Sequence, residues 1–279
     1  MRYNYSVVVP YRDKYELFIK AVNSIPDRED IQIIVVDNAP KALLQDMVPH
    51  KDVALVTYTN SSPKKGAGCA RNMGLKSVLG RYLLFLDADD YFTPDAFSEF
   101  DKYLDTVYDI VFFKPTSIFL NDGSSSDRHA EYELAIDRWL QNGDEGWIRY
   151  RWGSPWSKLF NTDFVLRGGY LFEETPVGND AWFSLQTGHH ANTIFASNAI
   201  VYVVTEGEKG QSLTKTTTRE NALIRYKGAI RINKFLKSVG RYDMHIRLLG
   251  FLRIAYSNFG LFELVNYIKL AIKEKVCVI

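Results

Sequence analysis

Four short apolar runs alternate with segments of helical periodicity in the first third of the chain. The runs occupy residues 5–9, 31–36, 53–57 and 81–86. Their β-branched and aromatic residues follow one another without regular polar alternation, which predicts strands buried on both faces. Helical spacing is found between the runs, at residues 14–24, 42–48 and 69–78. This order predicts an α/β fold with a mostly parallel, Rossmann-like sheet flanked by helices.

Glycine and other turn-forming residues indicate where these elements end. We expect Gly80 to end the helix at 69–78 as a C-cap, because glycine readily adopts the left-handed conformation of that position. A loop rich in Ser, Pro, Lys and Gly is expected at residues 60–68. The later pattern predicts a helix at 95–104, a strand at 109–114, a polar turn at 121–128 and a strand at 199–204.

The last quarter of the chain differs from the rest in composition and charge. Residues 205–218 are rich in Gly, Ser and Thr, which predicts a mobile loop and a domain boundary. From Arg219 onward, twelve Lys and Arg residues face four acidic ones, a net charge of +8 that leaves −7 for the first 218 residues. The basic tail suggests an anionic partner such as a membrane surface, although a solvated helical face fits equally well. The acidic remainder disfavours a nucleic-acid partner.

The cysteine content and the absence of long apolar stretches bear on the compartment. Cys69 and Cys277 are far apart and fit no metal-ligand or redox spacing, which favours a reducing environment. The chain enters its first apolar run without the pattern of a signal peptide, and no stretch is apolar for long enough to span a bilayer. We therefore expect a cytoplasmic protein.

Three carboxylates, Asp87, Asp89 and Asp90, directly follow the most apolar of the runs. Holding that much negative charge together at the end of a buried strand is unfavourable without a cation. Oxygen ligands with few other donors nearby indicate Mg²⁺ or Mn²⁺, held partly by the phosphates of a substrate. The alternative is a solvated acidic turn that caps a helix beginning at Asp95.

Two other apolar runs also end in polar residues. Pro10-Tyr11-Arg12-Asp13 follows the first run, and Asp37-Asn38 follows the second. Ligands of doubly wound sheets bind beyond the carboxyl ends of the strands. We therefore expect these residues and the Asp87–Asp90 cluster to belong to one binding site.

Four segments in the first 100 residues carry a family resemblance. They are residues 6–11 (SVVVPY), 33–38 (IIVVDN), 66–74 (GAGCARNMG) and 84–90 (LFLDADD). In order and separation they resemble the family 2 glycosyltransferases with the GT-A fold, of the type that builds bacterial polysaccharide and lipopolysaccharide. The resemblance continues more weakly at residues 156–160 and 178–183 and is thin after residue 205.

The resemblance implies a GT-A catalytic domain over residues 1–205, followed at 206–279 by a mobile loop and a basic helical tail. Residues 1–100 would bind the nucleotide and residues 101–205 the acceptor. A nucleotide-sugar donor, expected to be a UDP-sugar, and a Mn²⁺ or Mg²⁺ cofactor are also implied. The implied donor-binding residues are Pro10, Tyr11, Asp37, Arg71, Asp87, Ala88, Asp89 and Lys215. Lys215 would meet the diphosphate on loop closure, although an ordinary exposed lysine fits as well.

The same resemblance assigns roles within this set. Asp37 would accept a hydrogen bond from a uracil-type base, and Arg71 would lie over the base or near the phosphates. Asp87 would contact the ribose and Asp89 would bind the metal, with Asp87 as the second metal-ligand candidate and Asp90 in support. A salt bridge from Arg71 to one of the acids is the alternative for that residue, and the two roles are compatible.

The acceptor hydroxyl needs a general base, which the family usually places in a Glu-Asp pair ahead of a helix. Here the pair reads Asn179-Asp180, so the Glu is missing and Asp180 is the expected base. The alternative is that Asp180 only N-caps the helix expected at 181–186. Glu173 and Glu174 are the second choice for the base.

Acceptor contacts are the least specific part of the interpretation. Trp152 and Trp156 flank a Gly-Ser-Pro segment and are expected, with Asn179, to shape an acceptor platform; core packing is an equal alternative for Trp156. His189 and His190 could supply a metal ligand, but a pair of packed or surface histidines is the better expectation.

Together these features predict an inverting glycosyltransferase that moves a sugar from a nucleotide-sugar to a hydroxyl of a glycan or lipid-linked acceptor in cell-surface polysaccharide synthesis. The altered Asn179-Asp180 pair keeps open a non-catalytic nucleotide-sugar-binding or scaffolding relative. Apolar residues among the Lys and Arg of the tail suit peripheral contact with the inner, anionic face of the plasma membrane. Packing of those helices back onto the catalytic domain is the alternative.

Overall fold

The computed structural model describes residues 3–39, 43, 45–49, 53–57, 66–207 and 218–276. Lys215 and most of the expected loops at 60–68 and 205–218 lie outside these ranges. Of the helix expected at 42–48, the described part contains a single 3₁₀ turn, η1 (Gln45–Met47).

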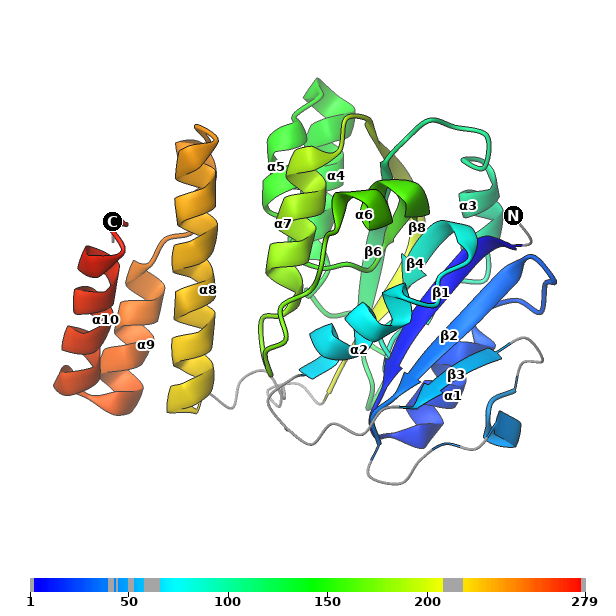
Figure 1. Ribbon diagram of the computed structural model, residues 1–279, viewed down its shortest axis with the longest axis horizontal. Helices are drawn as coiled ribbons and strands as arrows, with labels where there is room; N and C mark the ends of the chain where they lie inside the picture. Colours follow the sequence, from blue (N-terminus) through cyan, green and yellow to red (C-terminus); the bar gives the residue numbers. More distant parts are fainter. Residues whose placement is uncertain are drawn as a thin grey trace.

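An eight-stranded sheet forms the centre of the described chain (Figure 1). Its strands in spatial order are β3 (Val53–Thr57), β2 (Ile31–Asp37), β1 (Tyr3–Tyr11), β4 (Gly80–Phe85), β7 (Lys158–Asn161), β6 (Ile110–Phe119), β8 (Ile194–Glu206) and β5 (Tyr91–Phe92). Neighbours are parallel from β3 to β4 and between β6 and β8, whereas β7 and β5 run antiparallel to their neighbours. The predicted mostly parallel, mixed sheet is confirmed.

Helices cover both faces of this sheet because its central strands are apolar on both sides. The side chains of β1 point to two different cores. Tyr5, Val7 and Val9 face one core, which a first group of helices covers, whereas Val8 faces a second core, which a second group of helices covers. The first group is α1 (Tyr15–Asn23) and α3 (Ala96–Asp101). The second group is α2 (Gly66–Leu75), α4 (Ala130–Asn142), α5 (Glu145–Tyr150), α6 (Thr162–Gly168) and α7 (Asp180–His190).

The prediction that Gly80 is a helix C-cap is wrong, because Gly80 is the first residue of β4 and pairs with Tyr3 of β1. A Cβ at this position would lie 2.4 Å from the carbonyl carbon of Tyr5 and 2.5 Å from the nitrogen of Ser6. Its amide donates a hydrogen bond to Ser6 Oγ at 2.8 Å. Gly80 therefore allows β4 to approach β1 closely, which the sequence pattern alone did not separate from a helix end.

The tail is helical, as predicted, and lies beside α7 rather than on the sheet (Figure 1). It contains α8 (Arg219–Ser238), η3 (Tyr242–Met244), α9 (Leu249–Phe259) and α10 (Leu261–Lys273). Tyr226 of α8 stacks on Tyr267 of α10 with ring centroids 4.4 Å apart, and Leu236 packs with Leu185 of α7. Within the described ranges, no helix combines the length and the apolar character needed to cross a membrane.

Two helical glycines allow the packing of α2 against the sheet to be tested. A Cβ on Gly74 would lie 2.5 Å from Cγ1 of the buried Val8, whereas a Cβ on Gly228 of α8 would meet nothing within 4 Å. We expect Gly74→Ala to lower the free energy of unfolding by about 1–3 kcal/mol through overpacking. The matched Gly228→Ala change should raise it by about 0.5–1 kcal/mol through helix propensity. Urea unfolding measures both, and equal shifts would contradict this packing.

Candidate active site

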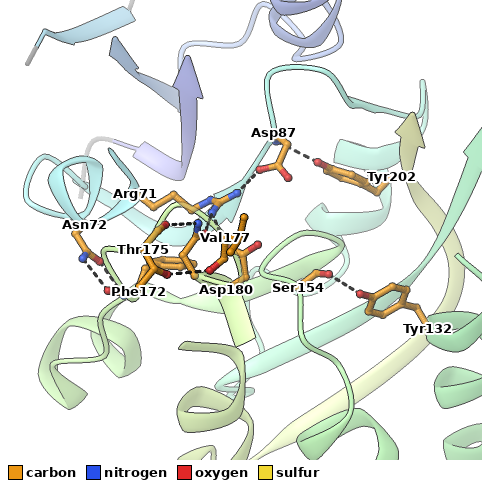
Figure 2. A network of polar contacts seen from close by, with 11 residues as sticks. Arg71, Asn72, Asp87, Tyr132, Ser154, Phe172, Thr175, Val177, Asp180 and Tyr202 are labelled. Carbon is orange, nitrogen blue, oxygen red and sulfur yellow. Dashed lines mark hydrogen bonds and ion pairs between the residues drawn. The ribbon is translucent and has the colours of Figure 1, made fainter. Parts of the chain in front are cut away.

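The candidate site lies at the point in the sheet where the strand order reverses. β2 and β3 lie on one side of β1 and β4 lies on the other, so the carboxyl ends of β1 and β4 border a topological switch point. Asp87 follows β4, Arg71 comes from α2, and Asp180 is the first residue of α7. Figure 2 shows these three side chains pointing toward one another from separate elements.

Arg71 joins the two carboxylates. It is 2% exposed, and its guanidinium donates to Asp87 through Nη2 and to Asp180 through Nη1 (Figure 2). Nη1 also lies 3.2 Å from Oδ1 of Asn179. The planar arrangement of donors in arginine allows such simultaneous pairing. The salt bridge expected as the alternative for Arg71 is present, and the buried Nε of Arg71 has no hydrogen-bond partner within the described residues.

Asp180 does not act as a helix cap. α7 begins at Asp180 itself, Asn179 occupies the N-cap position, and no side-chain capping bond is formed there. The Asp180 side chain is about one-third exposed and bonds to Arg71. Burial raises the pKa of Asp180, and the charge of Asp87 adds to the rise while Arg71 opposes it. A carboxylate with a raised pKa is a stronger base, as proton abstraction from a hydroxyl requires.

The three clustered aspartates have different surroundings. Asp89 is 47% exposed, and Lys14 Nζ lies 3.9 Å from its Oδ2. Asp90 is buried, accepting hydrogen bonds from the Tyr202 hydroxyl at 3.0 Å and the Thr205 amide at 2.7 Å. Burial raises the pKa of Asp90 well above its ordinary value, with contributions from the neighbouring aspartates. Asp90 thus joins the end of β4 to β8, while Asp89 is the member open to solvent.

This donor set suits a hard divalent cation. Across the described ranges, no three His, Cys, Asp or Glu side chains gather into a closed metal cage. Mg²⁺ and comparable ions commonly need only one or two carboxylates, completing their shell with water and substrate phosphates. Asp89 could hold such an ion directly, and Asp87 could do so if it released Arg71.

The histidine alternative for the metal is wrong. His189 and His190 lie at the far end of α7 from Asp180, about 14 Å along the axis at 1.5 Å per residue. His189 Nδ1 lies 3.1 Å from the Tyr150 hydroxyl, and its ring packs on Phe235. His190 is exposed, and its ring stacks on Tyr170 with centroids 5.7 Å apart, so the expectation of packed or surface histidines fits the pair better.

Asp37 has a structural task in this conformation. It is 1% exposed, and its two oxygens accept hydrogen bonds from the amides of Ala39 at 2.8 Å and Leu43 at 2.7 Å. These bonds hold the segment after β2 against the strand end. Contact between Asp37 and a nucleotide base would require this segment to move, so that role stays a prediction.

The other residues expected near the donor are only partly accessible. The ring of Tyr11 packs on Phe18 at 4.5 Å between centroids, so it belongs to the core, while its carbonyl accepts a hydrogen bond from the Asn38 amide. Pro10 and Ala88 are half-buried beside it, and Ala88 packs against the same core. These residues would therefore contact a nucleotide-sugar mainly through backbone atoms.

The tryptophan platform stays a prediction, and both rings are mostly buried. Trp152 is 2% exposed and packs against Phe112 and Tyr132, and Trp156 is 5% exposed and stacks on Tyr202. Both rings lie largely in the core between the sheet and its helices, although Trp152 also lines a cavity of about 310 Å³ with Gly153 and Ala181.

The loop before α7 holds the remaining expected residues. Asn179 is buried, accepts from Arg71 and donates from Nδ2 to the Thr175 carbonyl at 3.1 Å. Glu173, a second-choice base, forms an ion pair with Arg231 of α8. Glu174 is exposed. Of the three carboxylates considered for the base, Asp180 is thus the one that pairs with Arg71.

Two polar residues at the site were not predicted. The Tyr202 hydroxyl lies 3.1 Å from the Asp87 amide, which donates to it (Figure 2). The same hydroxyl donates a hydrogen bond to Asp90. Lys158 is 1% exposed among aromatic rings, and its Nζ lies 3.4 Å from the Trp152 carbonyl. Burial lowers the pKa of Lys158 well below its ordinary value, and Asp180 is the charge that opposes this. Tyr202 lay in the strand expected at 199–204, whereas no strand was expected at Lys158. The partners of both residues depend on long-range pairing, of β7 with β4 and β6 and of β8 with β5 and β6.

Comparison with known families supports the resemblance drawn from the four segments. Residues 6–160, more than half of the chain, match the model described as Glycosyl transferase family 2. The GalNAc(5)-diNAcBac-PP-undecaprenol beta-1,3-glucosyltransferase of Campylobacter jejuni is 30% identical over 188 residues, covering 64% of this chain and 59% of that protein. The poly(ribitol-phosphate) beta-N-acetylglucosaminyltransferase TarS of Staphylococcus aureus is 22% identical over 218 residues, covering 75% of this chain and 37% of TarS.

Solved structures show the same fold. TarS residues 1–349 in complex with UDP-GlcNAc superimpose with a TM-score of 0.68 at 20% identity, over 97% of this chain and 81% of that fragment. The mannosyltransferase PcManGT from Pyrobaculum calidifontis, in complex with GDP-Man and Mn²⁺, gives a TM-score of 0.55 at 15% identity, over 98% of this chain and 76% of that one. This chain spans between 15% and 59% of the length of the curated relatives that it matches.

Removing the buried cation should leave two carboxylates without their partner. We expect Arg71→Met to lower the free energy of unfolding by about 3 kcal/mol, as for other broken buried ion pairs. The control is Arg81→Met, because Arg81 pairs with the fully exposed Asp105 and should contribute less than about 1 kcal/mol. Urea unfolding at neutral pH distinguishes the two, and a small loss for Arg71→Met would show that the network is not a stabilising link.

Proposed function

Because the chain belongs to glycosyl transferase family 2, we propose that it is an inverting glycosyltransferase with a nucleotide-sugar donor and a hydroxyl acceptor. The observation that carries the proposal is the Asp87–Arg71–Asp180 network. In this network one buried guanidinium pairs with two carboxylates. Asp87 lies at the expected donor site, and Asp180 is suited to act as the base.

On the donor side, we propose a UDP-sugar and a Mn²⁺ or Mg²⁺ ion. The complex of TarS with UDP-GlcNAc supports the nucleotide, and the complex of PcManGT with Mn²⁺ supports the metal. Asp89 would hold the ion, and Asp87 would contact the ribose. A bound divalent cation neutralises charge that develops on the leaving diphosphate. Lys215 stays a proposed contact to that diphosphate.

On the acceptor side, Asp180 takes the proton of the acceptor hydroxyl. The hydroxyl oxygen forms a bond to the anomeric carbon from the face opposite the diphosphate, whose bond to that carbon breaks as the nucleoside diphosphate leaves. The proton ends on an Asp180 carboxylate oxygen, and Arg71 fixes the orientation of that carboxylate. General-base catalysis of this kind contributes roughly 10²–10⁴-fold.

A non-catalytic relative is the second candidate, and Asn179 is the observation that favours it. An amide occupies the position where the family usually has Glu, and it is bound to Arg71 and the Thr175 carbonyl. We favour the enzyme because Asp180 retains its carboxylate, its raised pKa and its pairing with Arg71.

For the biological setting, we propose cell-surface polysaccharide synthesis at the cytoplasmic side. The Campylobacter jejuni relative is named for a PP-undecaprenol acceptor and TarS for poly(ribitol-phosphate). We also propose that residues 1–205 form the catalytic domain, with donor binding in 1–100 and acceptor binding in 101–205, and that 206–279 form an extension.

The extension carries a surface that suits an anionic leaflet. The exposed residues of α10 fall within a third of its circumference: Leu261, Phe262, Val265, Lys269, Ile272 and Lys273. The acids of α10 and its C-cap do not oppose this surface, because Glu263 is buried and paired with Arg219, and Glu274 pairs with Lys234. We propose that this α10 stripe contacts the membrane peripherally.

The roles of the aspartates can be separated by two substitutions. We expect Asp180→Asn to reduce release of UDP from a UDP-sugar by roughly 10²–10⁴-fold while UDP with Mn²⁺ still raises the melting temperature. Asp89→Asn should instead abolish the Mn²⁺-dependent part of that thermal shift. The exposed Asp105→Asn change is the control and should alter neither quantity.

The pH profile gives a further check on the base. Because the pKa of Asp180 is raised, the active deprotonated form should be lost as pH falls through a value above that of an ordinary aspartate. Undiminished turnover of Asp180→Asn would exclude Asp180 as the base.

Membrane contact can be measured by vesicle flotation of the full chain. We expect binding to vesicles of phosphatidylcholine mixed with phosphatidylglycerol and weaker binding to phosphatidylcholine alone. Phe262→Ser removes a ring that is 73% exposed and should weaken binding by about 1.5–3 kcal/mol. Val107→Ser removes an apolar residue outside the tail that is 81% exposed, and is the control. Equal binding of both variants would contradict the proposed surface.

A further inference from the structure

A row of cations on α8 borders a groove next to α7. Lys227, Arg231 and Lys234 recur at intervals of four and three residues, which places them on one face of the helix. They line a cavity of about 740 Å³ between Trp182 of α7 and the C-terminal end of α10. Its floor is apolar and includes Ile230, Phe235 and Leu270.

A second cavity adjoins this groove beside the N-terminal end of α7. It measures about 470 Å³ and lies between α8 and the chain at 173–181. Lys227 and Arg231 line both cavities, and Ala181, the residue after Asp180, lines the second. We call the two together the α8 trough. None of its lining residues belongs to the donor-side set on β1, β4 and α2.

The cations of the trough are available to a ligand. Arg231 pairs with Glu173 and Lys234 with Glu274, and both cations are about half exposed. Exposed pairs of this kind contribute little stability, so a ligand can replace them. Lys227 is exposed and has no ion pair within the described part of the chain. The net charge of the lining is positive, and Arg225 adds a further cation at the Asp180 end.

Arg231 is also held in a defined orientation. Its guanidinium lies 3.7 Å from the centroid of the Trp182 ring, two residues along α7 from Asp180. A stacked guanidinium keeps its edge free for bidentate contact with phosphate oxygens. The apolar floor and the Trp182 ring suit a sugar or an alkyl chain bound beside that phosphate.

We propose that the α8 trough binds the acceptor of the transfer reaction, and that this acceptor carries a phosphate ester or diphosphate. The inference rests on the proposed glycosyltransferase function, because it needs Asp180, which precedes the trough residue Ala181, to be the base. Lys227, Arg231 and Lys234 bind the phosphate, which orients the acceptor so that its sugar hydroxyl reaches Asp180. The chemistry is common to lipid-linked diphosphates and to polyol phosphates.

Two pairs of probes test the trough and distinguish those sources. Farnesyl diphosphate is compared with farnesol, and an oligomer of ribitol phosphate with ribitol. Binding to the full chain is measured by titration calorimetry in EDTA, so that no divalent cation links a probe to the donor-side aspartates. We expect at least one phosphate-bearing probe to bind more than tenfold tighter than its phosphate-free counterpart. The pair that shows this difference identifies the source.

Variants on one helix supply the matched comparison. The double variant Lys227→Gln/Lys234→Gln should weaken the phosphate-bearing probe by about 25-fold, or about fivefold for each lysine. Lys237→Gln, also exposed on α8 but outside the trough, should leave its affinity unchanged. Equal affinity of phosphate-bearing and phosphate-free probes, or an unchanged affinity in the double variant, would overturn the proposal.

The proposed function is checked separately in the same proteins. Stabilisation by UDP with Mn²⁺ should be the same in the wild type, the double variant and Lys237→Gln, because the donor residues are untouched. If UDP fails to stabilise the wild type, the glycosyltransferase proposal fails. If UDP stabilises all three but the lysines do not affect the phosphate probes, only the trough proposal fails.

Discussion

The buried guanidinium of Arg71 holds the site together, because it links the end of β4 to the start of α7 through Asp87 and Asp180. A cation that is 2% exposed is tolerated only when its charge is matched, so each carboxylate depends on the same partner. The close approach of α2 makes this possible. A Cβ on Gly66 would lie 2.3 Å from the Thr175 carbonyl oxygen, and one on Gly68 would lie 2.2 Å from that of Glu173. The two glycines therefore set the distance over which Arg71 reaches Asp180.

A second link ties the same strand end to β8. Asp90 accepts hydrogen bonds from Tyr202 and Thr205, and the Tyr202 hydroxyl also accepts from the Asp87 amide. The turn after β4 is thus held on both sides: Asp87 is drawn toward α7 and Asp90 toward β8, while Asp89 is left facing solvent. These different contacts explain how three neighbouring carboxylates can have different roles. Two of them fix the turn, and the third remains free to bind a cation.

The local parts of this arrangement could be predicted from the sequence, and the long-range parts could not. The apolar runs identified β1, β2 and β4, and the Asp87–Asp90 cluster was placed correctly at a strand end, because strand burial and chain order are local signals. Gly80 was misassigned because a helix end and a close strand contact use the same residue. The burial of Trp152 was not foreseen, because it depends on Phe112 of β6 and Tyr132 of α4, which are distant in the sequence. The pairing of Asp180 with Arg71, 109 positions apart, was foreseen only as an unspecified salt bridge.

The uneven charge of the chain acquires a structural meaning once the tail is placed beside α7. The first 218 residues carry −7 and include the aspartates suited to a divalent cation, whereas the last part carries +8 and supplies the lysines and arginines of the α8 trough. In the proposed function, a divalent cation would offset the repulsion between a donor diphosphate and the aspartates of the acidic side. An acceptor phosphate needs no such ion on the basic side. The two anionic substrates would therefore be kept apart by the sign of the charge that each one meets, with Asp180 between them.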